Sequence, residues 1–581
     1  MRAAVTLFCG LLVVPLATEM RIARAQTFEK HVAVSQEEHA SVVGRDVMRQ
    51  GGNAIDAAVA TAFALAVTHP AAGNLGGGGF IVAYLADRRE VVTIDFRERA
   101  PAAATPRMYL DAQGHLLPHH RAGARAAGVP GTVRGLGLAH AKHGRLPWKQ
   151  LVLPAVELAR QGFPVSATLA RSLNDQLFTK GRLEVGGRDD LGTDPDRLSD
   201  FPESVAAYAK PDHTPWRAGD RLIQPDLAAT LERIASGGPD EFYRGRTAQL
   251  IADYSREHGG LITREDLASY QAESRKPIHS TFRGFDIYGM GPPASGGIVL
   301  AQMLNILEHF DLKHDGRQSA RTLHRVTEAM RRGFFTRATE IADPAFVTVP
   351  VDKLISKEYA AELARSITER ATPSAQLAPF RILPAEGNDT THLSTMDGAG
   401  NAVALTYTLE EGYGAKAVVA GAGFLLNNEM GDFNLIPDRT DVSGRIGTTP
   451  NLIAPSKRML SSQTPTLVLK DGQVRIVTGS PGGRTIPNTV LWVVLNLLEF
   501  GLEPREAVDG ARTHHAWFPD VLTLEGATWP ETIREELSAL GHRTRQVAIQ
   551  GDAHTIVVDP ESGRRVGVPD RRRQTSAAAG D

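Results

Sequence analysis

The segment Asp389-Thr390-Thr391-His392 constrains this chain more than any other. It follows a Pro-, Ala- and Gly-rich stretch, residues 371–387, and opens a strand-like run. If the bond before Thr390 breaks, Thr390 gains a free α-amine, whose unperturbed pKa is about 7.7–8.0. Such an amine suits general-base catalysis and activates a threonine hydroxyl. The segment predicts a chain that cleaves itself to expose a threonine nucleophile, although it could also simply lead a loop into a strand.

Six further motifs flank this segment: residues 51–58 (GGNAIDAA), 73–80 (GNLGGGGF), 95–98 (DFRE), 427–433 (NNEMGDF), 457–462 (KRMLSS) and 479–483 (GSPGG). In this order and spacing, the seven motifs together resemble those of the γ-glutamyltranspeptidases, or glutathione hydrolases. The resemblance extends from about Lys30 to near Val558.

The pattern of hydrophobic residues predicts mainly helices between about Pro147 and Ile367, and mainly strands from Thr390 onward. This pattern favours a layered α/β (α+β) sandwich. The resemblance specifies the four-layer αββα sandwich of the N-terminal nucleophile hydrolases. It also implies self-cleavage between Asp389 and Thr390 into a large subunit (26–389) and a small subunit (390–581), which remain together as a heterodimer.

The N-terminus resembles a secretory signal peptide covering residues 1–25. Arg2 precedes an apolar run, and Ala23-Arg24-Ala25 offers a small-x-small cleavage site. The run is too short for a confident membrane-spanning helix. We therefore expect a secreted protein, in the periplasm of a bacterium. Cys9, the only cysteine, lies inside this segment, so the mature chain would have no disulfide and no thiol nucleophile.

Threonines that follow the nucleophile suggest how it is assisted. The sequence predicts a hairpin whose turn lies at 397–400. If the turn centres between its second and third residues, Thr390 sits opposite Tyr407, flanked by Thr406 and Thr408. The resemblance assigns Thr408 a hydrogen bond to the nucleophile, whereas both threonines could also be ordinary strand residues.

Acyl transfer needs hydrogen-bond donors directed at the developing oxyanion. Gly482 and Gly483 can present two backbone N–H groups without a side chain in the way. The resemblance makes them the oxyanion hole. In isolation, the same five residues, 479–483, could equally form a plain turn.

A γ-glutamyl group ends in a zwitterion, which calls for a cation and for anions. An arginine suits its α-carboxylate, and the resemblance assigns Arg97 to it, with hydroxyls from Ser461 and Ser462. Three acids are expected around its α-ammonium: Glu410, Glu429 and Asp432. Relatives commonly have asparagine at the position of Glu410, so the extra acid puts the affinity for glutamate and the pH optimum in doubt.

Neither a metal nor a cofactor is expected. The histidines show no metal-ligand spacing with a third partner, and the glycine run 76–79 lacks the strand and helix of a dinucleotide site. That run instead predicts tight backbone packing near the pocket. A net charge of −2 gives no sign of a nucleic-acid partner.

Two segments lead to weaker expectations. The stretch 436–450 has the place and length of a lid over the glutamate site but contains no aromatic residue, so we expect a looser closure. The tail from Arg571 onward is expected to be disordered.

The predicted reaction is cleavage of the γ-glutamyl amide of glutathione and related compounds, with transfer of the γ-glutamyl group to water or to an acceptor amine. Two alternatives remain open at this point. One is an acylase of the same fold that acts on glutaryl or other side chains. The other is an uncleaved relative that only binds γ-glutamyl peptides.

Overall fold

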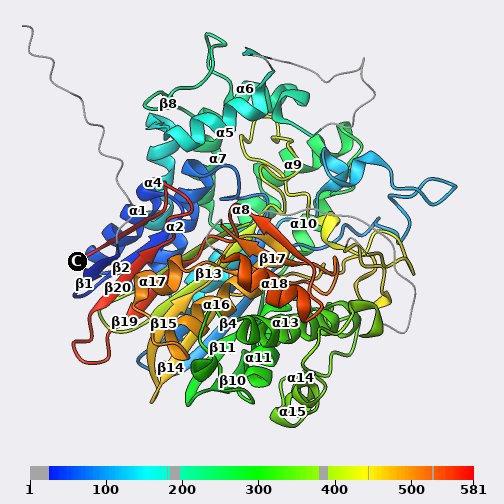
Figure 1. The fold of residues 1–581 in the computed structure, drawn as a ribbon. Coiled ribbons are helices and arrows are strands. Elements are labelled where there is room, and N and C mark those ends of the chain that lie inside the picture. Colours follow the sequence, from blue (N-terminus) through cyan, green and yellow to red (C-terminus); the bar gives the residue numbers. More distant parts are fainter. Residues whose placement is uncertain (1–24, 180, 184–195, 378–389, 443, 527–528) are drawn as a thin grey trace, which may run out of the picture.

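Two seven-stranded sheets stack face to face in the computed structural model, which describes residues 25–179, 181–183, 196–377, 390–442, 444–526 and 529–581 (Figure 1). All strand pairs within these two sheets are antiparallel. Asp389 and nearly all of the proposed signal peptide lie outside the described residues.

The first sheet contains the segment that starts at Thr390. Its strands, in spatial order, are β21 (Ala577–Gly580), β2 (Val32–Ser35), β12 (Thr391–Met396), β13 (Ala402–Thr408), β3 (Gly78–Leu85), β4 (Glu90–Phe96) and β9 (Glu273–Arg275).

The second sheet has the strands β1 (Gln26–Phe28), β20 (Arg565–Pro569), β19 (His554–Val558), β15 (Gln473–Thr478), β14 (Thr466–Lys470), β11 (Phe285–Gly289) and β10 (Ile278–Phe282), again in spatial order. A small third sheet combines β16 (Thr513–His514), β17 (Leu522–Glu525) and β18 (Thr544–Val547). Two short ribbons pair β5 (Phe163–Pro164) with β8 (Arg221–Leu222), and β6 (Phe178–Thr179) with β7 (Arg182–Leu183).

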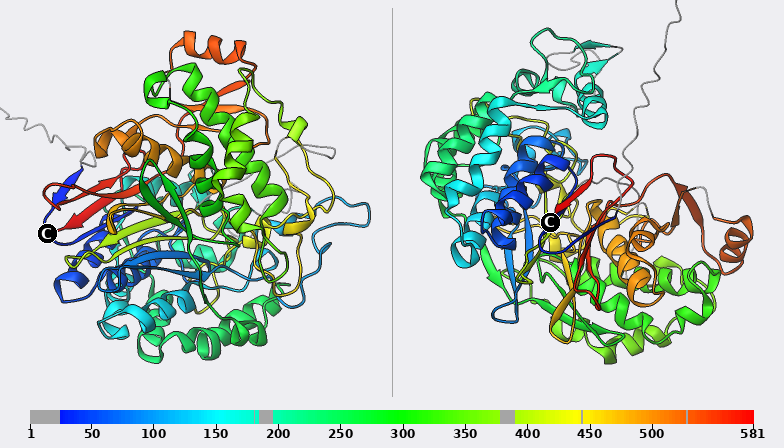
Figure 2. Two further views of the ribbon diagram at one scale, coloured as in Figure 1. Left: turned by 90° about the horizontal axis from the view of Figure 1, so that it is seen from below. Right: turned by 90° about the vertical axis from the view of Figure 1, so that its left-hand side faces the viewer.

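Helices cover both outer faces, so that the molecule has four layers (Figure 2). One hydrophobic core joins the first sheet to α1 (Glu38–Arg49), α2 (Ala54–Thr68), α3 (Thr132–His143), α4 (Trp148–Gln161), α5 (Ala167–Leu177), α6 (Pro202–Tyr208), α7 (Pro225–Gly237), α8 (Pro239–Arg244), α9 (Arg246–Glu257) and α10 (Arg264–Ser269).

A second core joins the other sheet to α11 (Gly296–Leu307), α12 (Leu312–Asp315), α13 (Ala320–Glu340), α14 (Val351–Leu354), α15 (Lys357–Arg365), α16 (Ile486–Leu498) and α18 (Glu531–Ala539). The short α17 (Pro504–Asp509) packs beside α16. A third core, which includes Phe80, Val82, Leu467, Val477 and Ile556, fills the space between the sheets. The αββα prediction is therefore confirmed.

Local sequence signals explain where the first two helices begin. Asn53 and Asp56 cap α2 reciprocally, each side chain accepting the other's backbone N–H at 3.0 Å. Residues 35–38 have the sequence form of a capping box, but no such box forms. Ser35 is the last residue of β2, and Glu37 caps α1 by accepting the N–H of Ala40 at 3.2 Å.

The C-terminal tail is ordered, contrary to the prediction from sequence. β21 pairs with β2 along its whole length, and the C-terminus lies beside the first strands of the chain (Figure 1). Upstream, Arg572 pairs with Glu525 at 2.6 Å and with Asp570 at 3.0 Å. Alanine has little intrinsic preference for strands, so only the long-range pairing with β2 orders this segment.

Deleting residues 577–581 should therefore lower the midpoint of thermal unfolding by about 3–6 °C, because several backbone hydrogen bonds are lost. Asp581→Asn is the matched control, since it retains the strand and removes only a partly exposed ion pair with Arg49. Equal unfolding midpoints for the deletion and the unaltered protein, measured by calorimetry, would contradict this assignment.

Candidate active site

The β12–β13 hairpin sets the position of the predicted nucleophile. Thr391 pairs with Tyr407, so the position opposite Thr390 belongs to Thr408. The prediction that Tyr407 faces Thr390 is thus wrong by one residue. The observed register brings Thr390 Oγ1 within 3.3 Å of Thr408 Oγ1.

The turn explains the shifted register. It spans 397–401 and centres on Ala399, because Asp397 Oδ1 accepts the N–H groups of Ala399 at 2.9 Å and Asn401 at 3.1 Å. Gly400 supplies the positive φ of 91° that such a turn needs. Side-chain hydrogen bonds of this kind lengthen the turn by one residue relative to the predicted four-residue turn at 397–400.

The glycine run 76–79, which leads into β3, packs its backbone directly against β13, as the sequence predicts. A Cβ atom built on Gly79 would lie 2.2 Å from the carbonyl oxygen of Thr406, and one on Gly77 would lie 1.9 Å from that of Thr408. No side chain fits at either position, so the run holds Thr408 close to its neighbours.

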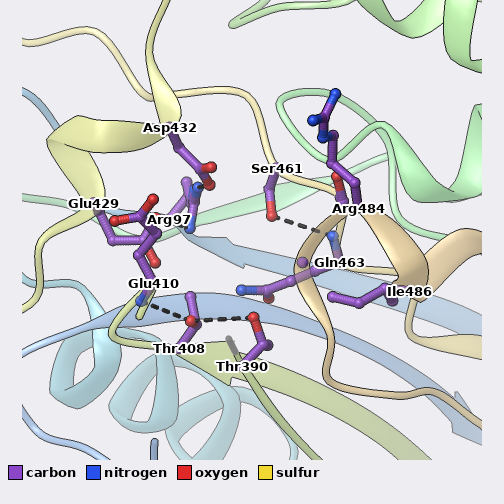
Figure 3. A pocket seen from close by; sticks show the side chains of 12 residues that line it. Arg97, Thr390, Thr408, Glu410, Glu429, Asp432, Ser461, Gln463, Arg484 and Ile486 are labelled. Atoms are coloured by element: carbon purple, nitrogen blue, oxygen red, sulfur yellow. Dashed lines mark hydrogen bonds and ion pairs between the residues drawn. The ribbon is translucent and has the colours of Figure 1, made fainter. Parts of the chain in front are cut away.

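Thr408 is oriented by a second hydrogen bond. Its Oγ1 accepts the backbone N–H of Glu410 at 2.8 Å, so its own proton can be donated to Thr390 (Figure 3). Glu410 reaches this position through a φ of 80°, which is uncommon for a residue with a side chain. The geometry therefore suits Thr408 for supporting the Thr390 oxygen.

Arg97 is buried at the centre of a group of acids. Its Nη1 lies 2.6 Å from Glu429 Oε2 and 3.4 Å from Glu98 Oε2, while Nη2 donates to Asp432. Although burial opposes its charge, the nearby carboxylates outweigh burial and raise the pKa of Arg97. The guanidinium is therefore a permanent cation held inside the protein.

The same guanidinium ties the acids to the 457–462 motif. Arg97 Nε donates to the carbonyl oxygen of Met459, and Nη2 donates to that of Leu460, each at 3.3 Å. The backbone of Ser461 is fixed in turn by Ser295, whose N–H and hydroxyl donate to its carbonyl oxygen at 2.8 and 2.7 Å. Arg97, Ser295 and Ser461 therefore occupy fixed positions relative to one another.

The acids outnumber the local cation, and burial raises the pKa of three of them. Burial raises the pKa of Glu98 to about 7, despite the opposing effect of Arg97. Burial also raises the pKa of Glu410 well above its usual range, and the negative charges of Asp432 and Glu411 add to this effect. The pKa of Glu429 is raised mainly by burial as well. An additional positive charge in this pocket would be strongly favoured.

The GSPGG loop brings a third element to the pocket. Gly483 lines the same pocket as Thr390, and Gly482 precedes it with a φ of 125°. A Cβ atom on Gly482 would lie 2.4 Å from Thr485 Oγ1. α16 starts three residues after Gly483, and the N-terminus of a helix favours negative charge nearby.

The structure gathers nearly all the predicted site residues around one pocket. Its lining is Arg97, Thr390, Thr408, Glu410, Glu429, Asp432, Ser461, Ser462, Gln463, Gly483, Arg484 and Ile486. Three lining residues were not predicted from the sequence: Gln463, Arg484 and Ile486. Each directly follows, or lies within three residues of, a predicted residue, and that proximity was the only signal that could have identified them.

A wider cavity of about 590 Å³ adjoins this pocket and shares Glu410, Asp432 and Arg484 with it. Residues 444–446, from the predicted lid segment, form part of its wall. Four arginines line it: Arg121, Arg337, Arg445 and Arg484. The acids Glu410, Glu411 and Asp432 line it too, and Arg121 pairs with Glu411 at 2.6 Å, so this cavity offers arginine side chains beside the acids of the inner pocket.

The remaining predictions concern metals and membranes. Among the described residues, no three His, Cys, Asp or Glu side chains cluster as metal ligands. His515 is 1% exposed and packs in the core, and burial lowers its pKa to about 4. Within the same part of the chain, no helix has both the length and the apolar character to span a membrane.

The four layers and a threonine at the head of a central strand define the N-terminal nucleophile hydrolases. Within that class, the γ-glutamyltranspeptidase family matches residues 40–580. This chain belongs to that family.

Individual relatives agree with this assignment. The glutathione hydrolase proenzyme of Escherichia coli (strain K12) is 44% identical over 547 residues, which cover 93% of this chain and 90% of that protein. A cephalosporin acylase from Bacillus halodurans has a similar structure, with a TM-score of 0.82, 27% identity and 99% coverage of both chains. The γ-glutamyltranspeptidase of Helicobacter pylori is 43% identical, with a TM-score of 0.54, and the match covers 59% of this chain and 93% of that chain.

Thr408→Val should lower kcat for a γ-glutamyl anilide by about 10-fold or more, because Thr390, the predicted nucleophile, loses a hydrogen-bond partner. Thr408→Ser keeps the hydroxyl and should retain most of the activity. The rate of aniline release, followed in a stopped or a continuous assay, measures both variants. Equal rates for the valine and serine variants would show that the hydroxyl plays no part.

The raised carboxyl pKa values predict how stability depends on pH. A buried acid with a raised pKa binds a proton in the folded protein that the unfolded chain has already released. Its contribution to the free energy of unfolding is therefore lost as the pH rises, for Glu98 from about 4.5 to about 7.

Glu410→Gln should flatten this decline and make the empty protein more stable than the unaltered protein at pH 8. Thermal unfolding between pH 5 and pH 8 measures the effect, with Glu257→Gln on the exposed end of α9 as the control. A Glu410→Gln variant with the same pH dependence as the unaltered protein would rule out this role of the buried acid.

Proposed function

We propose that the chain is a self-processing γ-glutamyltransferase and glutathione hydrolase. In the precursor, Thr390 Oγ attacks the carbonyl carbon of Asp389, and the peptide nitrogen of Thr390 leaves as a free amine. Water then opens the resulting ester and releases the carboxylate of Asp389. The relatives described as proenzymes and the position of Thr390 at the head of β12 support this step.

The interleaved strands support a stable heterodimer after cleavage. β12 and β13, which follow the proposed cut, lie between β2 and β3, which precede it. In the second sheet, β14 from the later part pairs with β11 from the earlier part. Separating the two fragments would break hydrogen bonds in both sheets, so they stay together as large and small subunits.

In the mature enzyme, Thr390 Oγ attacks the γ-carbonyl of the substrate, and its own α-amine accepts the hydroxyl proton. The backbone amides of Gly482 and Gly483 stabilise the oxyanion. The leaving amine takes the proton, and a γ-glutamyl ester on Thr390 remains. Water or an acceptor amine then attacks this ester, which yields glutamate or a new γ-glutamyl amide and restores the nucleophile.

The substrate assignment depends on Arg97 and its acidic partners Glu429 and Asp432, which line the same pocket as Thr390. The Arg97 guanidinium pairs with Glu429 and Asp432. A zwitterion can replace these pairings without leaving a charge alone, because its carboxylate meets Arg97 while its ammonium meets Glu429 and Asp432. A γ-glutamyl group is such a zwitterion.

The adjoining cavity with its four arginines suits the rest of the donor. Glutathione continues beyond the γ-glutamyl amide to a terminal carboxylate, which arginine side chains bind well. We propose glutathione as the physiological donor for this reason. The apolar N-terminal run further supports export of the precursor, to the periplasm if the source is a bacterium.

An acylase function is the second candidate, because a cephalosporin acylase shares the fold over 99% of both chains. A glutaryl group carries a carboxylate for Arg97 but no ammonium. Its binding to Arg97 would leave the buried Glu429 and the partly exposed Asp432 without their cation. Such unpaired groups are costly, so the pocket favours the γ-glutamyl substrate.

The kinetic test compares L-γ-glutamyl-4-nitroanilide with glutaryl-4-nitroanilide. We expect kcat/KM to be at least about 100-fold higher for the γ-glutamyl compound, since the site would reject an analogue that lacks the ammonium. Asp432→Asn should lower this ratio mainly by weakening the γ-glutamyl reaction. A higher kcat/KM for the glutaryl compound would replace the proposed function with the acylase.

A further inference from the structure

Gln463 has a buried polar side chain in the active-site pocket, and its amide is unpaired within the described part of the chain. It is 2% exposed, and it lines the pocket together with Thr390 and Ser461. Neither its Nε2 nor its Oε1 has a hydrogen-bond partner in the described protein. Figure 3 shows this side chain extending into the pocket above Thr390 and Thr408.

The backbone of Gln463 leaves its side chain few other choices. Its N–H donates to Ser461 Oγ at 3.2 Å. A Cβ atom on Gly296 would lie 2.4 Å from the Gln463 carbonyl oxygen, so the start of α11 packs closely against this residue. With the main chain held on both sides, the amide can pair only with something inside the pocket.

An unpaired buried amide lowers stability, because the group loses its hydrogen bonds to water without gaining others. A protein core tolerates such a group where it serves a ligand. The pocket therefore calls for a ligand with a hydrogen-bond acceptor beside Gln463.

The γ-glutamyl group of the proposed substrate offers three polar parts. Its ammonium already meets acids, and its γ-carbonyl oxygen is assigned to the amides of Gly482 and Gly483. Its α-carboxylate meets Arg97, but this arginine also donates to the carbonyl oxygens of Met459 and Leu460, so the carboxylate needs further donors. A carboxylate has about four lone-pair positions to fill.

We infer that Gln463 determines specificity by donating a hydrogen bond from its side-chain amide to the α-carboxylate of the γ-glutamyl group, beside Ser461 and Ser462. This inference rests on the proposed function and extends it to one further residue. Three consecutive residues, 461–463, then form one carboxylate-binding wall opposite the acids that receive the ammonium.

Isothermal titration calorimetry tests the contact without relying on turnover. The ligands are L-glutamate and its α-amide, L-isoglutamine, and the proteins are the unaltered enzyme, Gln463→Met and Gln463→Glu. Methionine keeps the length of the side chain and removes its donors, whereas glutamate places a like charge against the carboxylate. Gln302→Met is the control, because Gln302 is a buried glutamine of α11 that lies outside the pocket lining.

For Gln463→Met we expect Kd for L-glutamate to rise about 10–100-fold, as for loss of a hydrogen bond to a charged group. Kd for L-isoglutamine should rise about threefold or less, because its neutral amide is a weaker acceptor. Gln463→Glu should weaken L-glutamate binding further, and the Gln302 variant should bind like the unaltered enzyme. Unfolding midpoints confirm that each variant is folded, and Gln463→Leu replaces Gln463→Met if the latter does not fold.

Equal changes in Kd for both ligands, or no change, would overturn the role of Gln463. That result leaves the proposed function standing as long as the unaltered enzyme binds L-glutamate and cleaves the γ-glutamyl anilide. An unaltered enzyme that binds no L-glutamate would overturn both.

Discussion

The pairing of β12 with β13 is the constraint on which the rest of the site depends. It places Thr390 opposite Thr408 and brings their hydroxyl oxygens to 3.3 Å. The same strands lie between β2 and β3, so the nucleophile is built into the middle of a sheet rather than onto its edge. A strand position of this kind is rigid, which suits a reaction whose attacking oxygen must be held within about 0.5 Å of its productive position.

Charge balance around Arg97 links this geometry to the choice of substrate. A buried cation and several buried acids would be unfavourable separately, and the structure keeps them because they are paired. A ligand that displaces these pairings is favoured if it carries both a negative charge for Arg97 and a positive charge for the acids. The surplus of acids, with Glu410 in addition to Glu429 and Asp432, favours the ammonium end and makes the empty site sensitive to pH.

Much of this arrangement could be predicted from the sequence. The helices between Pro147 and Ile367 and the strands from Thr390 onward follow from the pattern of hydrophobic residues, because this periodicity acts locally. Most pocket residues could be predicted because the motifs that contain them resemble the motifs of a known family. Two effects escaped prediction. Hydrogen bonds to the Asp397 side chain lengthened the turn and shifted the hairpin register by one residue. The long-range pairing of β21 with β2 ordered a tail with little strand preference. Gln463 was missed because only the structure shows that its amide has no partner.

Self-cleavage before Thr390 is the central claim, and the intact mass of the purified protein tests it most directly. The protein is incubated for a day at neutral pH beside a Thr390→Ala variant. The account predicts two fragments from the unaltered chain, the smaller with Thr390 as its first residue, and a single uncut chain from the variant. One uncut chain in both samples would remove the catalytic amine and leave a protein that only binds γ-glutamyl compounds.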